Sequence, residues 1–176
     1  MRQLEHAPRL QSEPVTRSLG HQLPDNVRSL LDGTDLAGRE GLTFQLLTTD
    51  EDGWPQVALL SVGELVAVDS QTIRAGLWLH SGTSKSLTRS GRATLVAIAD
   101  GNGYYVRVAG RRGEDLDLGA EGRLAFFALD IQDVQEDSAD YARLTSGITF
   151  KLADPSAVVP RWQRTVDALR AAVVPA

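Results

Sequence analysis

Short segments in which apolar and polar residues alternate follow one another along most of the chain. In residues 72–79, apolar side chains occupy every second position from Ile73 to Leu79, which is the pattern of a strand with one buried face. Residues 93–99 form a continuous apolar run, which predicts a strand covered on both faces, and the alternation in 129–134 favours a further strand. The other expected strands are 42–48, 54–62, 65–68, 104–110 and 147–152.

Helical patterns are short in the first half of the chain and longer near its end. Residues 24–33 predict a short helix with Pro24 in its first turn, and residues 83–90 predict a second helix that ends at Gly91. Because the second helix has little to bury beyond Leu87, we expect it on the rim of the domain. Residues 138–144 are expected to form a helical turn and 111–122 a loop. A third helix is expected over 155–172, with an apolar stripe made of Trp162, Val166, Leu169 and Val173.

Together these elements predict a mainly β fold with flanking helices. About six of these strands, running antiparallel, would form a barrel or sandwich, with one rim helix and a helix at each end. Residues 1–22 are polar and broken by Pro8 and Pro14, so we expect a flexible N-terminal tail. Residues 23–176 are enough for a single domain with its own core.

Composition narrows the classes of function. The formal net charge of −5 and the pI near 5.2 argue against nucleic-acid binding. The absence of cysteine excludes disulfides, thiolate metal sites and a cysteine nucleophile. Only His80 of the three histidines lies outside the expected tail, so no metal site is predicted. No segment resembles a signal peptide or a membrane span, so we predict a cytoplasmic protein without membrane contact.

A cationic segment interrupts this acidic chain. No Asp or Glu occurs between Asp69 and Asp100, whereas Lys85 and Arg89 lie four residues apart on the expected second helix. The turn Ser81-Gly82-Thr83-Ser84 precedes them and offers hydroxyl and backbone N–H groups at a helix N-terminus, where phosphate commonly binds. The alternative interpretation is a Ser/Thr-capped basic helix in solvent.

Residues 24–152 resemble the FMN-binding split barrel of the pyridoxamine 5′-phosphate oxidase-like superfamily. Three pieces carry the resemblance: the hairpin 46–58 with its acidic-Gly turn and Trp54-Pro55 pair, the strand Gln56-Val57-Ala58-Leu59-Leu60-Ser61, and the pattern Ser81-x-Thr83-x-x-Ser86-Leu87-x-x-x-Gly91-Arg92. The last is similar to the turn and helix start that hold the FMN phosphate in that family. The resemblance implies a six-stranded antiparallel split β-barrel.

The resemblance also implies a cofactor, a partner and a site. It implies FMN bound in a cleft between the two protomers of a homodimer, with oxidoreductase chemistry on a small molecule supplied by the flavin ring. No catalytic side chain is identified. The implied cofactor-binding residues are Gln56, Leu60, Ser61, Trp78, Leu79, His80, Ser81, Gly82, Thr83, Ser84, Lys85 and Tyr105.

Several positions depart from the family pattern. Gln56 and Ser61 stand where the oxidases proper carry Arg and Lys, and Thr83 stands where the phosphate loop usually has a basic residue. These changes argue against true pyridoxamine 5′-phosphate oxidase activity. The alternatives are a non-enzymatic flavin-binding or stress module, a barrel that uses a deazaflavin, and a barrel without a cofactor. Haem is disfavoured because only His80 is available as an iron ligand.

Overall fold

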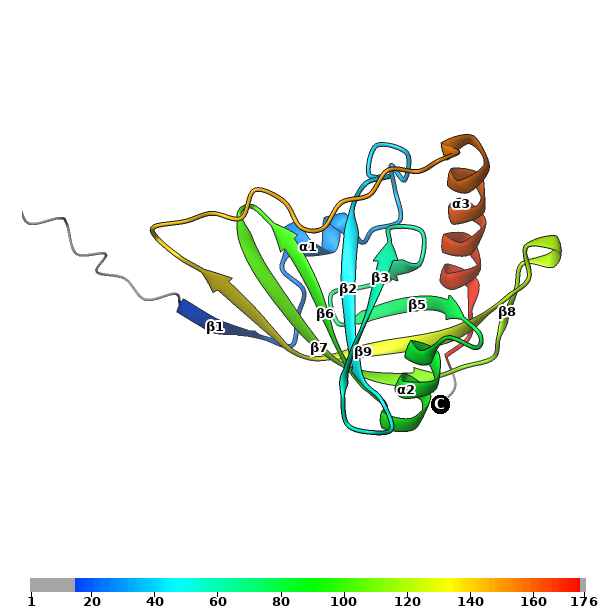
Figure 1. The fold of residues 1–176 in the computed structure, drawn as a ribbon, viewed down its shortest axis with the longest axis horizontal. Coiled ribbons are helices and arrows are strands. Elements are labelled where there is room, and N and C mark those ends of the chain that lie inside the picture. Colours follow the sequence, from blue (N-terminus) through cyan, green and yellow to red (C-terminus); the bar gives the residue numbers. More distant parts are fainter. Residues whose placement is uncertain (1–14, 175–176) are drawn as a thin grey trace, which may run out of the picture.

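The computed structural model describes residues 15–174 and is built around one antiparallel sheet (Figure 1). The hydrogen-bonded order of its main path is β3-β2-β6-β7-β9-β5-β4, and β1 and β8 both pair with β9. The strands are β1 (Val15–Gly20), β2 (Thr43–Thr49), β3 (Pro55–Ser61), β4 (Leu65–Ala67), β5 (Thr72–Trp78), β6 (Arg92–Ala99), β7 (Asn102–Arg112), β8 (Leu116–Asp117) and β9 (Arg123–Ser138). The predicted mainly β class is confirmed.

Three α-helices flank the sheet: α1 (Asp25–Leu30), α2 (Gly82–Ser90) and α3 (Pro155–Ala171). A short 3₁₀ turn, Gly119–Glu121, lies between β8 and β9. In Figure 1, α3 stands beside the open end of the curled sheet, and α2 lies below β5. Among the described residues, none of the helices combines the length and the apolar character needed to cross a membrane.

The core lies on the concave side of the curled sheet. Phe127, Leu129 and Val106 are fully buried there. Strand β6 alternates between buried residues such as Leu95 and partly exposed ones such as Val96. The prediction that this strand is covered on both faces is therefore wrong for the single chain, because Thr94, Val96 and Ile98 on the other face are only partly buried.

Helix α2 is defined by strong local signals at both ends. The Ser81 side chain caps its N-terminus, and Gly91 ends it in the left-handed conformation with φ 62°. Its inner side packs into the sheet, so Thr83, Ser84 and Ser86 are buried as well as Leu87. The expectation that this helix buries little beyond Leu87 is wrong, since small hydroxyl side chains let it approach the strands closely.

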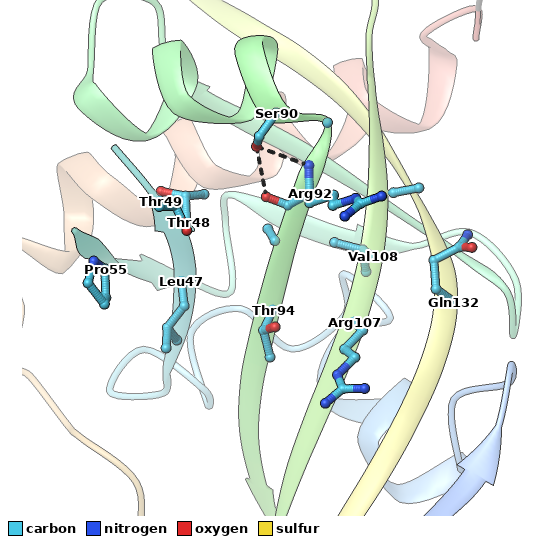
Figure 2. A pocket seen from close by; sticks show the side chains of 13 residues that line it. Leu47, Thr48, Thr49, Pro55, Ser90, Arg92, Thr94, Arg107, Val108 and Gln132 are labelled. Carbon is cyan, nitrogen blue, oxygen red and sulfur yellow. Dashed lines mark hydrogen bonds between the residues drawn. The ribbon is translucent and has the colours of Figure 1, made fainter. Parts of the chain in front are cut away.

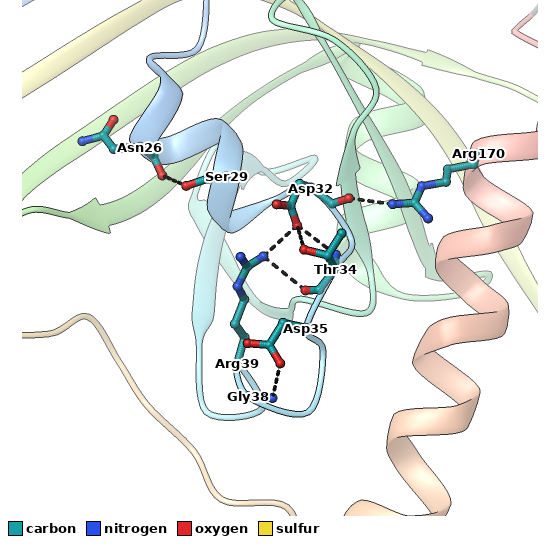
Figure 3. A network of polar contacts seen from close by, with 8 residues as sticks. All are labelled: Asn26, Ser29, Asp32, Thr34, Asp35, Gly38, Arg39 and Arg170. Carbon is teal, nitrogen blue, oxygen red and sulfur yellow. Dashed lines mark hydrogen bonds and ion pairs between the residues drawn. The ribbon is translucent and has the colours of Figure 1, made fainter.

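A polar network holds the loop between α1 and β2 (Figure 3). Asp32 Oδ1 accepts hydrogen bonds from Thr34 N–H and Arg39 Nη1, at 2.8 and 2.7 Å. Burial alone would raise the pKa of the Asp32 carboxyl, but the hydrogen bonds from the Thr34 hydroxyl, from Arg39 and from the Thr34 N–H together outweigh it and lower the pKa. Arg170 of α3 donates to the Asp32 carbonyl at 2.6 Å. This network therefore ties α3 to the loop.

Five local predictions are corrected by the structure. Residues 15–20 form β1 on the edge of β9 instead of continuing the expected tail, while residues 1–14 lie outside the described residues. Residues 138–144 do not form a helical turn, and 147–152 contribute only an isolated bridge between Leu42 and Thr149. The expected loop 111–122 contains the end of β7, β8 and the 3₁₀ turn. Val173 is 85% exposed and does not belong to the apolar stripe of α3.

Candidate functional site

The hydroxyl groups at the start of α2 are mostly engaged in building the turn. Ser81 Oγ accepts the Ser84 N–H at 3.1 Å and donates to Ser84 Oγ at 3.0 Å. Ser84 Oγ in turn donates to the Trp78 carbonyl at 2.8 Å. Thr83 is buried, with only 6% of its surface exposed. Of the predicted ligands, Thr83 and Ser84 therefore direct their side chains inward, and Ser81 serves as the helix cap.

Backbone donors and one lysine remain available at this helix start. Within the described residues, the N–H groups of Gly82 and Thr83 have no hydrogen-bond acceptor, and both lie at the positive end of the α2 dipole. Gly82 and Lys85 are exposed. The donor set thus consists of two adjacent N–H groups and one ammonium group, which is suited to a phosphate.

Strand β3 brings Gln56 against the same turn. A Cβ atom added to Gly82 would collide with the Gln56 side-chain amide, so glycine permits this close approach. Gln56 Oε1 also accepts a hydrogen bond from Ser86 Oγ at 3.3 Å. Gln56 and the 81–85 turn, which are separate in the sequence, are therefore neighbours.

Trp78, Leu79 and His80 lead into the turn from β5. Trp78 is 54% exposed, and the Arg161 guanidinium carbon lies 5.7 Å from the centre of its ring. Leu79 is half-buried against the core, whereas His80 is exposed. Arg161 itself is half-buried, although it lies on a helix whose other arginines are exposed.

Leu60 and Ser61 lie at the opposite end of β3 from Gln56, beside a groove of about 390 Å³. Glu64 lines the same groove, and its Oε2 accepts hydrogen bonds from Ser61 N–H and Ser61 Oγ, at 2.7 and 2.8 Å. Burial raises the pKa of the Glu64 carboxyl, although the Ser61 hydrogen bonds and the charge of Arg161 partly oppose this effect. Sequence reasoning missed Glu64, and no local motif marked it.

Tyr105 lies apart from the other predicted residues. The strand register aligns Leu59 of β3, Gln45 of β2, Val96 of β6 and Tyr105 of β7 in one row across the convex face of the sheet. Three strand spacings of about 4.8 Å separate Leu59 from Tyr105, a distance of about 14 Å. The Tyr105 hydroxyl donates to Asp137 at 3.1 Å. Within one chain, Tyr105 is therefore not part of the site around α2.

A further cavity also lies away from the predicted residues (Figure 2). It measures about 690 Å³ and opens on the convex face, between the β2–β3 hairpin, the end of α2 and strands β6 and β7. Leu47, Thr94 and Arg107 line its centre, and Arg92 lies at its upper end. None of the twelve predicted cofactor residues lines it. No group of three or more metal-ligating side chains occurs in the part of the chain described.

The sequence has a relative of nearly the same length. The uncharacterized protein YclD of Bacillus subtilis is 37% identical over 148 residues, which cover 84% of this chain and 96% of YclD. The chain belongs to the YclD family. No model of a known protein family matches the sequence.

Solved structures show which known fold this chain resembles. A provisionally named pyridoxamine 5′-phosphate oxidase from Lactobacillus delbrueckii aligns with a TM-score of 0.53 at 20% identity, covering 66% of this chain and 97% of that one. An FMN-binding protein from Syntrophomonas wolfei aligns with a TM-score of 0.41 at 17% identity, over 62% of this chain and 84% of that one. The first similarity confirms the predicted split-barrel fold.

Proposed function

We propose that this YclD-family protein is a flavoprotein that binds FMN with its phosphate at the start of α2. The proposal rests on one observation: several groups that can bind a phosphate lie around Gly82. They are the free N–H groups of Gly82 and Thr83, the exposed Lys85 side chain and the Gln56 amide. The segment from Ser70 to Ala99 adds no carboxylate that would repel an anion. Bound flavin supplies hydride and electron transfer, so the proposed activity is an oxidoreductase reaction on a small molecule.

The residues of the chain have distinct proposed roles at this site. The two N–H groups and the α2 dipole would hold the phosphate, and Lys85 would add a full positive charge. Gln56 offers an amide where the oxidases proper carry arginine, so it orients a ligand by hydrogen bonding and adds no charge. The exposed ring of Trp78 provides a flat apolar surface next to the turn. None of these groups is assigned a proton-transfer role.

The phosphate assignment is tested with FMN and riboflavin, which differ in the phosphate alone. We expect the wild type to bind FMN more tightly than riboflavin. Lys85→Glu should weaken FMN binding about ten- to a hundredfold, because a hydrogen bond to a charged group contributes about 1.5–3 kcal/mol, and should leave riboflavin binding nearly unchanged. Lys151→Glu is the matched control, since it makes the same charge change at an exposed residue outside α2.

Absorbance of the bound compound and titration by fluorescence quenching provide the measurements. Equal affinities for FMN and riboflavin in the wild type would contradict the phosphate assignment, as would equal effects of the two lysine variants. A deazaflavin with a phosphorylated tail would use the same contacts, and its absorbance spectrum distinguishes it from FMN. The uncharged residues Gln56, Ser61 and Thr83, which stand where the resemblance implies basic residues, favour a second candidate, a flavin-binding module without turnover. That candidate predicts bound FMN that is reduced no faster than free FMN.

We further propose that two chains pair through the convex face beside β3. Strand β3 ends the sheet path, and its Val57 and Leu59 are 52% and 56% exposed. An unpaired edge with exposed apolar residues is normally covered in the functional protein. Pairing would also allow Tyr105 of one chain to approach the site of the other. We expect a dimer by sedimentation velocity and a monomer for Leu59→Lys; a monomeric wild type at tens of micromolar would contradict this proposal.

A further inference from the structure

The short turn between β3 and β4 fixes one carboxylate oxygen and leaves the other available. Glu64 Oε2 accepts both hydrogen bonds from Ser61, and the Glu64 carbonyl accepts the Gly76 N–H at 2.9 Å. Glu64 Oε1 has no hydrogen-bond partner among residues 15–174, and the carboxylate has no ion pair there within 4.0 Å. Glu64 therefore presents a positioned acceptor at the wall of the groove.

Arg161 brings unused donors to the same place. Its guanidinium lies over the Trp78 ring, and in the described part of the chain it makes no hydrogen bond or ion pair. A guanidinium group carries five N–H donors, so its donor capacity is open. Arg161 and Glu64 together line the 390 Å³ groove and also the small adjoining cavity that contains Trp78. The acceptor Glu64, in the turn after β3, and the donor Arg161, on α3, thus line the same groove.

The remaining walls of the groove are largely apolar. Phe150 and Trp162 meet edge to face with ring centres 6.2 Å apart, and both line it. Leu59 and Ile148, on opposite sides, are 56% and 46% exposed. Cavities of this volume with apolar walls and a few positioned polar groups are typical of small-molecule sites. These walls are suited to a flat ligand of mostly apolar surface.

We propose that this groove binds a planar small molecule through an amide or imide edge, whose N–H donates to Glu64 Oε1 and whose adjacent carbonyl accepts from Arg161. The role as substrate site rests on the proposed function, because this groove is lined by Leu60 and Ser61, which the family resemblance implies as flavin-binding residues. The ligand would also give hydrogen-bonding partners to the open Glu64 Oε1 and to the unused donors of the Arg161 guanidinium.

Two probes that differ only in their hydrogen-bonding edge test the proposal. Quinazolinedione is flat and carries an imide edge, and its N,N′-dimethyl derivative lacks the N–H donors. The indole N–H resonances of the three tryptophans report binding in isotope-labelled protein, with and without FMN. We expect quinazolinedione to shift the Trp162 and Trp78 signals saturably and to leave Trp54, which is 71% exposed in the β2–β3 turn, unchanged. The dimethyl derivative should bind about tenfold more weakly or not at all.

Isosteric variants assign the contacts. Glu64→Gln and Arg161→Met should each weaken quinazolinedione binding by about tenfold or more and leave FMN affinity unchanged. Arg164→Met, one turn along α3 and outside the groove, should have no effect. The proposal is overturned if the probe leaves Trp162 unshifted, if the dimethyl derivative binds equally well, or if both variants lose FMN to the same degree. Probe binding with these dependences in protein that takes up no FMN would refute the proposed cofactor and support the groove.

Discussion

A double-mutant cycle at the base of α2 tests how the helix is held against the sheet. Leu87 is fully buried, and a Cβ atom added to Gly110 of β7 would lie 2.8 Å from Leu87 Cδ1 and 3.2 Å from Leu87 Cγ. Leu87→Ala removes three buried carbons, worth about 2.4 kcal/mol in transfer free energy, and leaves a cavity, so we expect a loss of about 3–4 kcal/mol. Gly110→Ala alone should cost about 1–3 kcal/mol by overpacking.

The double variant should be more stable than the sum of the two losses. The added methyl group would occupy the space that the leucine branch vacates, which relieves the overpacking and refills part of the cavity. We therefore expect a coupling free energy of about 2 kcal/mol, measured from urea unfolding followed by circular dichroism. Gly103→Ala is the matched control, because its nearest contact would be an ordinary 3.5 Å and it lies on the far part of β7. This packing would be refuted if the stability loss of the double variant equals the sum of the losses of Leu87→Ala and Gly110→Ala to within about 0.5 kcal/mol.

Two further substitutions probe the α3 contact and the polar interior. Gly63→Ala places a methyl group where the Trp162 ring lies, so we expect the unfolding free energy to fall by about 1–3 kcal/mol and the tryptophan fluorescence to change. The control Gly103→Ala should show neither effect. Equal effects of the two variants would argue against the packing of α3 at Gly63. Glu136 is 8% exposed, and the Tyr104 hydroxyl lowers the pKa of its carboxyl more than burial raises it. A carboxyl whose pKa is lowered by folding stabilises the folded state at pH values above its pKa in the unfolded chain, which is about 4.5. This stabilisation is lost as the pH falls below that value. The stability gap between wild type and Glu136→Gln should therefore narrow in urea titrations below pH 4.5, and a gap independent of pH would contradict the assignment.

Local signals in the sequence were sufficient for several elements. Helix α2 begins after Ser81 and ends at Gly91, as the sequence indicated. An N-cap side chain and a C-terminal glycine in the left-handed conformation act through neighbouring backbone groups, so both are visible in the local sequence. The alternation in 72–79 and the turn at 50–53 likewise predicted β5 and the β2–β3 hairpin. The nearness of Gln56 to the 81–85 turn followed only from the family resemblance, since periodicity alone does not place separate strands together.

Other features depended on what surrounds a segment in space. Residues 147–152 have strand-like composition, but β2 already pairs with β3 and β6 on its two sides, so only the bridge to Leu42 forms. Residues 15–20 look polar and loop-like, yet they become a strand because the extended edge of β9 offers hydrogen-bonding partners.

The sequence by itself therefore determined the mainly β class, most of the strands and the two ends of α2, because short-range chemistry specifies each of them. Only the tertiary structure decided which groups remain free to bind anything. It turned Thr83 and Ser84 inward, placed Tyr105 three strands from β3, and brought Glu64 together with Arg161 across a groove. The physical reason is that burial and unmet hydrogen bonds are properties of the packed chain, set by strand order and helix docking between residues far apart in the sequence.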